Sequence, residues 1–451
     1  MSLDAYIPPS RQTEKPRDSY NYIGKSMKRV EDPRLLVGGG TYADDTNVAD
    51  MAHAAILRSP HAHAKIVSID KTKAEALPGV LCVMTGDEAA KETGPLPSWA
   101  NPPVNQYCIA LDRVRHVGEA VVAVVAESRY IAEDACDLVE VEYEPLPAVV
   151  DLEEALTSSG DAVLHPYRGD TNVALARTLT FGTVEEDFGK ADRIIERRFR
   201  WPRSGGTPLE THGAVASFDP ATGKFTITAN TSMYNYCGWM IADSLGVPAH
   251  KLNIVPTLAG GSFGAKLFSH KPCVLAATLA RAVGRPVKFM EDRIDNTTGC
   301  DAHASDRVYY AKLAIKDDGT LLSLRTHIID DYGAYFQFGV GQHGNALSQC
   351  VGPYAINSVE VELEAVLTNK CQQGAYRGFG SEVANFVIER LVDGAAAELG
   401  MDPVEIRRKN FIQPDQFPYL IPTGNMYDSG NYAAVLDETL KIAEYDVWRA
   451  K

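Results

Sequence analysis

The chain has 451 residues, of which 45% are apolar and 23% are charged, and its formal net charge is -15. This length predicts two or more domains, and the composition is that of an ordinary globular protein. The sequence lacks a basic stripe able to neutralise a phosphate backbone, which argues against nucleic-acid binding, and we interpret the acidic excess as a contribution to solubility.

Eight cysteines are spread along the chain, mostly in apolar stretches, and no C-x-x-C pair occurs. This spacing gives no iron-sulfur or zinc motif and predicts reduced, buried thiols, which are typical of a cytoplasmic protein. The polar N-terminal segment has no apolar core of a secretory signal, and no run of eighteen apolar residues predicts a membrane span. We therefore expect a cytoplasmic location.

Residues 1–20 form a polar, proline-bearing arm. From 21 to 155, short apolar runs such as "EAVVAVVAES" (119–128) alternate with turns and helical patterns, which predicts a compact α+β domain. Residues 156–170 are loop-like and make the best boundary. A second α+β region, 165–451, follows with strands expected near 194–200, 213–218 and 224–230. The predicted fold class is α+β throughout.

Three helices of the second region should end at a glycine that is followed by a proline. They are "YNYCGWMIADSLGVP", "HKPCVLAATLARAVGRP" and "SEVANFVIERLVDGAAAELGMDP", with their stops at Gly246, Gly284 and Gly400. A glycine at a helix end with a proline just beyond it is a strong stop signal. At the other end of the third helix, Ser381 is the expected N-terminal cap.

Glycine-rich loops precede two of these helices. "LAGGSFGAKLFS" leads into the helix near His270, and "QQGAYRGFG" leads into the helix at Ser381. Glycine lets the backbone approach a ligand closely, and a helix N-terminus adds partial positive charge, so two such loops predict a cradle for a flat anionic group. Either loop alone could equally be a tight turn before a helix.

Nucleotide-binding motifs do not account for these loops. A Walker motif fails because Ala265 and Leu267 stand where a glycine and a serine or threonine are needed, and no G-x-G-x-x-G follows a strand. Arg377 inside its glycine-flanked loop could donate several hydrogen bonds to an anion, or it could form a surface salt bridge.

Two further constellations favour structural roles. His61 and His63 lie two residues apart, as a strand-borne metal pair might, but no third ligand follows at a suitable spacing. Glu119 follows a glycine next to a strand pattern and is interpreted as part of the turn that enters the strand.

The two loops carry a resemblance to a known family. "GGSFGAK" (260–266) and "AYRGFG" (375–380) resemble the molybdopterin-binding loops of the xanthine dehydrogenase and aldehyde oxidase family of molybdenum hydroxylases. "GKSMKRVEDPRLLVGGGTYADD", "LRSPHAHAKIVSIDKTKAEALPGV" and "VGEAVVAVVAES" resemble its N-terminal hammerhead domain. The resemblance implies a hammerhead-type domain over 21–155, then the first half of the molybdopterin-binding region over 165–451.

The resemblance also implies a set of site residues. Those expected to contact a molybdenum-molybdopterin group, in its cytosine dinucleotide form, are Gly261, Ser262, Phe263, Gly264, Ala375, Tyr376, Arg377 and Ser232. Those expected at the substrate pocket are Phe379, Leu267, Asn345 and Phe338, although Phe338 could equally be a packing residue. No side chain is expected to ligate the molybdenum, which the pterin dithiolene would hold.

Several positions depart from the family pattern. Ser232 stands where many members have a glutamine, while Leu267 and Asn345 replace the glutamate and arginine of purine-oxidising members, which argues against xanthine. Gly378 replaces the copper-binding cysteine of the carbon monoxide dehydrogenase branch, which argues against that activity. The remaining pocket is apolar enough for an aromatic or N-heterocyclic ring.

The implied chemistry is oxidative hydroxylation of an N-heterocyclic, aromatic or aldehyde substrate, with water as the oxygen source. Hydride would pass to the molybdenum centre, and electrons would pass on to 2Fe-2S and FAD subunits. The family's general-base glutamate, in a G-x-G-E type stretch, has no match after residue 382, so no catalytic residue is assigned.

The chain also stops about midway through the family pattern. We therefore expect the N-terminal half of a split subunit, with the glutamate on a second molybdopterin-binding chain, in preference to a truncation. A noncatalytic pterin-binding or assembly subunit is the alternative.

Overall fold

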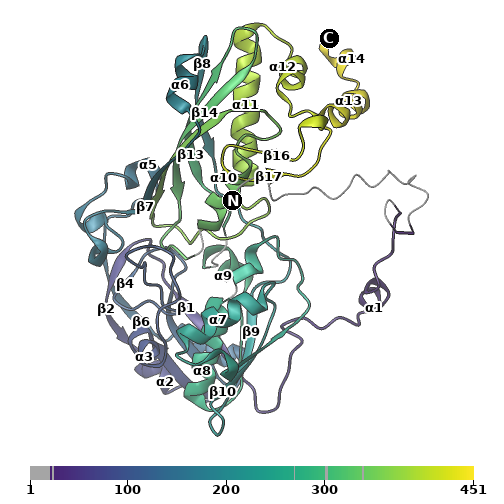
Figure 1. Cartoon of the computed structure of the whole chain (residues 1–451). Helices are drawn as coiled ribbons and strands as arrows, with labels where there is room; N and C mark the ends of the chain where they lie inside the picture. Colours follow the sequence, from purple (N-terminus) through teal and green to yellow (C-terminus); the bar gives the residue numbers. More distant parts are fainter. Residues whose placement is uncertain (1–20, 23–24, 269, 300–302, 338–339) are drawn as a thin grey trace. The chain divides into compact units, whose positions relative to one another are not determined.

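The computed structural model describes residues 21–22, 25–268, 270–299, 303–337 and 340–451 (Figure 1). The chain divides into two compact units. One consists of Tyr42–Phe411 with Ile421–Asn425, and the other of Met1–Thr41, Ile412–Leu420 and Met426–Lys451. Helices and strands alternate, which confirms the predicted α+β class.

The larger unit contains a seven-stranded sheet. Its strand order is β11 (Leu252–Pro256), β10 (Lys224–Ala229), β9 (Gly213–Asp219), β12 (Val287–Met290), β1 (Ala52–Arg58), β5 (Ala120–Ala126) and β3 (Val80–Thr85). Every residue of β5 is buried, as its unbroken apolar sequence requires. The parallel pair β1 and β12, in register Ala52 with Val287, joins strands from the two predicted domains into one sheet. The domain limits 1–20, 21–155 and 165–451 stay a prediction.

Helices α7 (Tyr234–Ser244) and α8 (His270–Val283) pack with this sheet around the largest apolar core. The first eleven residues of α8 are all buried, from His270 to Ala280. A three-stranded sheet lies in the N-terminal part, in the order β4 (Arg113–Val114), β2 (Ala64–Asp70) and β6 (Glu140–Pro145). The short helices of that part are α2 (Thr72–Glu75), α3 (Gly86–Glu92) and α4 (Arg129–Cys136).

The third sheet of the larger unit has five strands, in the order β7 (Val173–Phe181), β15 (Ser358–Val366), β14 (Leu321–Asp331), β13 (Arg307–Ile315) and β8 (Arg193–Trp201). Only β14 and β15 run parallel. Helix α11 (Ser381–Leu399) packs along the sheet, as Figure 1 shows. The shorter helices are α5 (Leu152–Ala155), α6 (Val184–Gly189), α9 (Arg293–Thr298), α10 (Val340–Gln349) and α12 (Pro403–Asn410).

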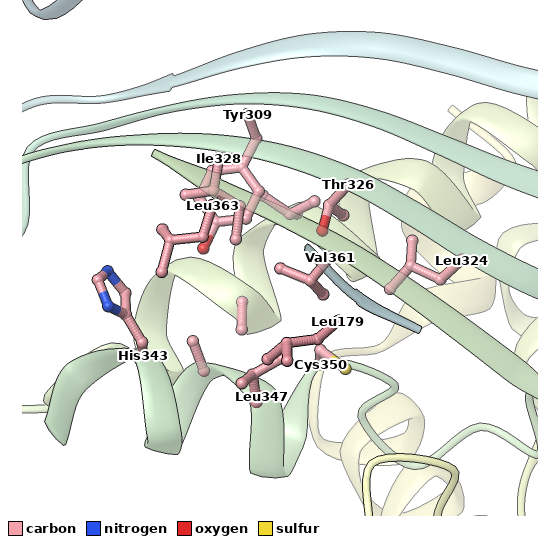
Figure 2. Close-up of a pocket in the computed structure, with 13 residues that line it drawn as sticks. Leu179, Tyr309, Leu324, Thr326, Ile328, His343, Leu347, Cys350, Val361 and Leu363 are labelled. Carbon is pink, nitrogen blue, oxygen red and sulfur yellow. The ribbon is translucent and has the colours of Figure 1, made fainter. Parts of the chain in front are cut away.

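A cavity of about 30 Å³ separates this sheet from α10 (Figure 2). Leu324, Ile328 and Val361 line it from the strands, and Leu347 lines it from the helix. A space of this size holds about one water molecule, so it is a packing gap and too small for an organic ligand.

The smaller unit contains α1 (Asp32–Leu36), the paired strands β16 (Tyr419–Leu420) and β17 (Met426–Tyr427), and the helices α13 (Tyr432–Ile442) and α14 (Tyr445–Arg449). The Asn431 side chain caps α13 by accepting a hydrogen bond from the Ala434 N–H at 3.1 Å. In the described ranges, no helix is both long and apolar enough to cross a bilayer.

The predicted helix stops are confirmed, and α11 begins at Ser381 as predicted, but the predicted cap residue of α11 is wrong. Gly246, Gly284 and Gly400 have φ of +67°, +66° and +65°, the left-handed conformation that ends a helix. At the start of α11 the cap is Gly380, whereas Ser381 is already helical. Gly380 has φ +97° and donates its N–H to the Glu382 carboxylate at 2.7 Å. A Cβ there would overlap the Gln342 carbonyl, so tertiary contact decides the cap residue.

Candidate functional site

The two glycine-rich loops lie side by side. The Arg377 N–H donates to the Phe263 carbonyl oxygen at 2.8 Å. A Cβ at Gly264 would lie 2.6 Å from the Ala375 carbonyl oxygen, so only glycine allows this approach. The first loop runs from β11 through a 3₁₀ turn, Ala265–Phe268, into α8, and the second runs into α11. Each of the two contacting loops therefore leads into a helix.

Both loops contain a phenylalanine at positive φ, with glycines at positive φ close to it. The φ angles are +98°, +52° and +101° at Gly261, Phe263 and Gly264, and +103°, +49° and +97° at Gly378, Phe379 and Gly380. A non-glycine residue at positive φ costs about 1–3 kcal/mol and persists only where its surroundings enforce it. Such strain concentrates at ligand sites, so each phenylalanine is a candidate site residue on backbone grounds alone.

Glu210 anchors the first loop at both ends. Its carboxylate accepts from the Gly260 N–H at 2.7 Å and from the Lys266 ammonium at 2.6 Å, and its own N–H donates to the Gly260 carbonyl at 3.0 Å. The Lys266 side chain is fully buried and that of Glu210 is 14% exposed. Burial alone would raise the pKa of Glu210, but the bonds from Lys266 and Gly260 lower it. Burial also lowers the pKa of Lys266, against the pull of Glu210.

A second buried pair lies behind the 3₁₀ turn. The His212 ring is hydrogen-bonded to the Ala265 carbonyl at 3.1 Å, and its other nitrogen is 3.3 Å from the Glu291 carboxylate. Burial would raise the pKa of Glu291, but the charge of His212 and a hydrogen bond from Asn296 lower it to about 2. Glu291 is therefore ionised in the folded protein at neutral pH.

Gln342 on α10 holds the second loop. Its side-chain N–H donates to the Gly374 carbonyl at 2.6 Å, and its side-chain oxygen accepts from Ser305 at 2.7 Å and from Arg307 at 3.3 Å. Its backbone carbonyl abuts Gly380. Gln342 thus touches both ends of the segment that carries Arg377.

Buried charged side chains also support the second loop on the side of the five-stranded sheet. Asp330 on β14 pairs with the fully buried Arg307 at 2.9 Å and with His343 at 2.6 Å. Burial would raise the pKa of Asp330, but Arg307 and His343 lower it. The Gln373 side chain donates to Asp330 at 2.9 Å, which fixes the start of the second loop against β14.

The predicted cofactor contacts are gathered around the paired loops. Ser232 lies against the first loop, with its hydroxyl 2.9 Å from that of Ser262 and its N–H donating to the Lys266 carbonyl. Ala375 is buried in the main core and Tyr376 is half-buried. Arg377 is exposed and, within the described part of the chain, its guanidinium forms no ion pair, so the salt bridge of the alternative interpretation is not seen.

The predicted pocket residues are less closely gathered. Phe379 and Leu267 are both partly buried and pack against the main apolar core. Asn345 lies on α10, where its carbonyl oxygen accepts a hydrogen bond from Ser348 at 2.9 Å. Phe338 lies outside the described residues. The loops therefore account for two of the four positions.

His63 and Glu119 each make hydrogen bonds within the fold. The His63 ring is hydrogen-bonded to the Pro147 carbonyl at 2.7 Å, and burial lowers its pKa. Glu119 is buried directly before β5 and accepts from the Arg115 N–H at 2.6 Å and from the Tyr335 hydroxyl. Among the described residues, no three His, Cys, Asp or Glu side chains are placed to hold a metal ion, and none of the seven described cysteines forms a disulfide.

The donor set fits an anionic ligand. An exposed guanidinium on Arg377 and the hydroxyls of Ser232 and Ser262 lie on paired loops that lead into helix N-termini. The neighbouring carboxylate, Glu210, already accepts from Lys266 and from a backbone N–H, so it does not offset the positive character of the loops. Such an arrangement binds oxygen atoms that carry negative charge.

Comparison with known proteins agrees with this geometry. A model of the molybdopterin cofactor-binding domain matches residues 164–411, and a model of the aldehyde oxidase and xanthine dehydrogenase a/b hammerhead domain matches residues 37–147. The chain is 35% identical over 441 residues to the 6-hydroxypseudooxynicotine dehydrogenase complex subunit gamma of Paenarthrobacter nicotinovorans. The match includes 95% of this chain and 55% of that protein.

Two other similarities differ in how much of the relative they cover. The solved structure of CO dehydrogenase from Oligotropha carboxidovorans superposes with a TM-score of 0.87 at 34% identity, over 95% of this chain and 55% of that one. The nicotinate dehydrogenase large molybdopterin subunit of Eubacterium barkeri is 30% identical over 399 residues, which are 87% of this chain and 89% of that protein. The chain thus spans about half the length of some relatives and most of another.

Proposed function

Because the chain belongs to the aldehyde oxidase and xanthine dehydrogenase family, and carries its molybdopterin cofactor-binding domain, we propose that the paired loops hold a molybdenum-molybdopterin group. The observation that carries this proposal is the 2.8 Å hydrogen bond from the Arg377 N–H to the Phe263 carbonyl, which holds the two loops side by side. The proposed contacts are Gly261, Ser262, Phe263, Gly264, Ala375, Tyr376, Arg377 and Ser232.

The side chains have different roles in binding. The Arg377 guanidinium donates fixed hydrogen bonds to anionic oxygens. Ser232 and Ser262 are hydrogen-bonded to each other, so the hydroxyl that accepts in this pair donates its own proton to the ligand. Phe263 and Phe379 add apolar surface beside these donors. When bound, the molybdenum-pterin group supplies the two-electron oxidation and the activation of water.

The proposed reaction is oxidative hydroxylation of an N-heterocyclic, aromatic or aldehyde substrate, with water as the oxygen source. The apolar Leu267 and Phe379 support a ring-shaped substrate. The relatives named for nicotinate and 6-hydroxypseudooxynicotine support the N-heterocyclic class. The likeness to CO dehydrogenase does not carry over its substrate, because Gly378 stands where the resemblance places a copper-binding cysteine.

The complete enzyme in this proposal has further chains. A second molybdopterin-binding chain brings the general-base glutamate, and 2Fe-2S and FAD subunits take the electrons. The relative that this chain covers over 89% of its length is named a large molybdopterin subunit, which supports a divided molybdenum subunit. We further propose the cytosine dinucleotide form of the pterin and a cytoplasmic location, the latter supported by seven described cysteines without disulfides.

Native purification with metal analysis and mass spectrometry of co-purifying chains tests the proposal. We expect about one molybdenum per chain in the wild-type complex and a large loss of molybdenum in Arg377→Met. The matched control is Arg390→Met, whose exposed guanidinium pairs with Asp393 on α11, and this variant should keep its molybdenum. An intact complex without molybdenum refutes the proposal, and a molybdenum-loaded complex without turnover favours the noncatalytic alternative.

A further inference from the structure

A second cavity of the larger unit, of about 330 Å³, lies beside the segment that contains β4. The side chains that line it include Tyr107, Leu111, Asp112, Arg115, Tyr167 and Tyr335. None of its described lining residues belongs to the paired glycine-rich loops, so it is a separate site. A space of this size holds a small organic molecule, unlike the gap beside α10.

Tyrosine rings form walls of this cavity. The Tyr335 hydroxyl donates to the buried Glu119 carboxylate. The Tyr167 hydroxyl accepts from the Asn105 N–H at 2.7 Å. Both rings also pack against His165, with ring centroids 5.4 Å away for Tyr335 and 5.7 Å away for Tyr167. These contacts hold two aromatic rings in place, which favours a flat, ring-shaped ligand.

A buried guanidinium lines the same space. The Arg115 side chain is 8% exposed, and its Nε and Nη1 groups donate to the Leu164 and Arg113 carbonyls at 3.0 and 3.1 Å. Among the described residues, its Nη2 group donates only to the Asp112 carboxylate, at 3.3 Å. The Asp112 side chain is 64% exposed, and an exposed carboxylate contributes little to an ion pair. A ligand carboxylate can therefore take its place at Arg115.

The charges around the cavity also favour an anion. Burial lowers the pKa of His165 well below its ordinary value, and three arginines add to that effect, namely Arg115, Arg168 and Arg113. Two carboxylates, Asp112 and Glu119, contact Arg115. Positive side chains thus outnumber negative ones by one, and a ligand with a single negative charge balances the set.

Buried amides connect the cavity to the second glycine-rich loop. Gln106, between two lining residues, accepts a hydrogen bond from the Gln337 side chain. The Gln337 side-chain oxygen accepts from the Gln372 side chain at 3.1 Å and lies 2.7 Å from His270 Nε2. Gln372 begins the loop that carries Arg377, and His270 is the first residue of α8. A ligand that restrains segment 105–107 therefore also restrains the loop.

We propose that this cavity binds an aromatic carboxylate and that the bound ligand steadies the second glycine-rich loop. The aromatic ring lies against the tyrosines, and the carboxylate replaces Asp112 as the partner of Arg115. A ligand that binds the ordered form of a segment lowers the population of its open form. The site is separate from the one proposed for the molybdenum group, so each proposal can fail without the other.

Titration calorimetry of the full complex tests the ligand class with benzoate, benzamide and benzamidine, which share one shape and differ in charge. Benzoate should bind about tenfold more tightly than neutral benzamide, and cationic benzamidine should bind most weakly. Asp112→Asn removes the competing carboxylate and should tighten benzoate binding about threefold or more. The matched control is Asp317→Asn, whose exposed carboxylate pairs with Arg193 at 2.7 Å, and this variant should bind benzoate like wild type. Leu111→Trp fills the cavity and should abolish binding.

Hydrogen exchange tests the connection to the loop. Saturating benzoate should slow the exchange of segment 371–377 about threefold or more in the wild-type complex. In Gln106→Met, which removes the acceptor for Gln337, benzoate should still bind but this slowing should be absent.

Several outcomes would overturn the proposal. They are a failure of benzoate to bind at about 10 mM, equal binding of benzamide or benzamidine, and unchanged or weaker benzoate binding in Asp112→Asn. Retained binding in Leu111→Trp would place benzoate at another site. An unchanged exchange rate of segment 371–377 with benzoate bound would show that the cavity does not act on the loop.

Discussion

Replacing Glu210 by glutamine removes the charge that anchors the first glycine-rich loop. Its partner Lys266 is fully buried, with Nζ at 2.6 Å from the carboxylate. Removing one member of a buried pair costs about 3–5 kcal/mol, because the other charge is left uncompensated. Glu210 itself is 14% exposed, so we expect the lower end of that range, a loss of about 3 kcal/mol.

The loss should depend on pH in a way that identifies both groups. The pKa of Glu210 is lowered in the folded protein, so its contribution is present above the pKa of the unfolded state and is lost as pH falls through the folded pKa. In Glu210→Gln, burial still lowers the pKa of Lys266, and the opposing effect of the Glu210 carboxylate is lost. Raising the pH then neutralises the lysine and restores part of the stability, so the deficit is largest near neutral pH.

The assay is a double-mutant cycle of Glu210→Gln and Lys266→Met, followed by chemical unfolding and by hydrogen exchange of the Gly260 amide. Each single change should cost about 3 kcal/mol, or about a hundredfold faster exchange, and the double variant should cost much less than the sum. The exposed pair Lys65 and Glu144 is the control, with a coupling of about 0–1 kcal/mol. Additive losses would show that Lys266 does not depend on Glu210 and would refute this account of the loop.

Three further changes test other supports of the site. Gly264→Ala puts a Cβ 2.6 Å from the Ala375 carbonyl at φ +101°, so metal analysis should show loss of molybdenum from the complex. Gln342→Leu removes the hydrogen bonds that Gln342 makes with the Gly374 carbonyl and with Arg307, so calorimetry should show a loss of about 1–3 kcal/mol, together with lower molybdenum content. Glu291→Gln removes a carboxylate whose pKa is lowered from 4.5 to about 2 in the folded protein, which corresponds to a loss of about 3 kcal/mol in the free energy of unfolding at neutral pH. In urea titrations this loss should become smaller as the pH falls from 4.5 toward 2.

Helix ends illustrate which parts of the fold the sequence could predict. The stops at Gly246, Gly284 and Gly400 were predictable because a left-handed residue at a helix end is a local requirement that glycine meets. The cap residue of α11 was not predictable, because Gly380 becomes the cap through contact with Gln342 on another helix. A cap that depends on a distant carbonyl has no signature in its own residues.

The candidate site also contains residues that the sequence could predict and residues that it could not. The loops around Phe263 and Arg377 were found because their glycine pattern is dense and resembles a known family. Glu210 and Gln342 were missed because a single acid or amide in an ordinary segment carries no signal. The partner of Glu210, Gly260, lies 50 residues away, and the partner of Gln342, Gly374, lies 32 residues away. The sharing of one sheet by both predicted domains, through β1 and β12, was missed because strand pairing at long range leaves no local pattern.

The positions of these missed residues explain how the loops can stay strained. Phe263 and Phe379 each cost about 1–3 kcal/mol in backbone strain, and the groups that enforce it are buried or partly buried side chains behind the loops. Glu210 and Gln342 bind loop backbone, while Arg377 and Ser232 are exposed and Ser262 is partly exposed. The protein's own contacts therefore hold the loops in this conformation, which lowers the ordering cost of binding. Losing an anchor should thus weaken binding even though the anchor never touches the ligand.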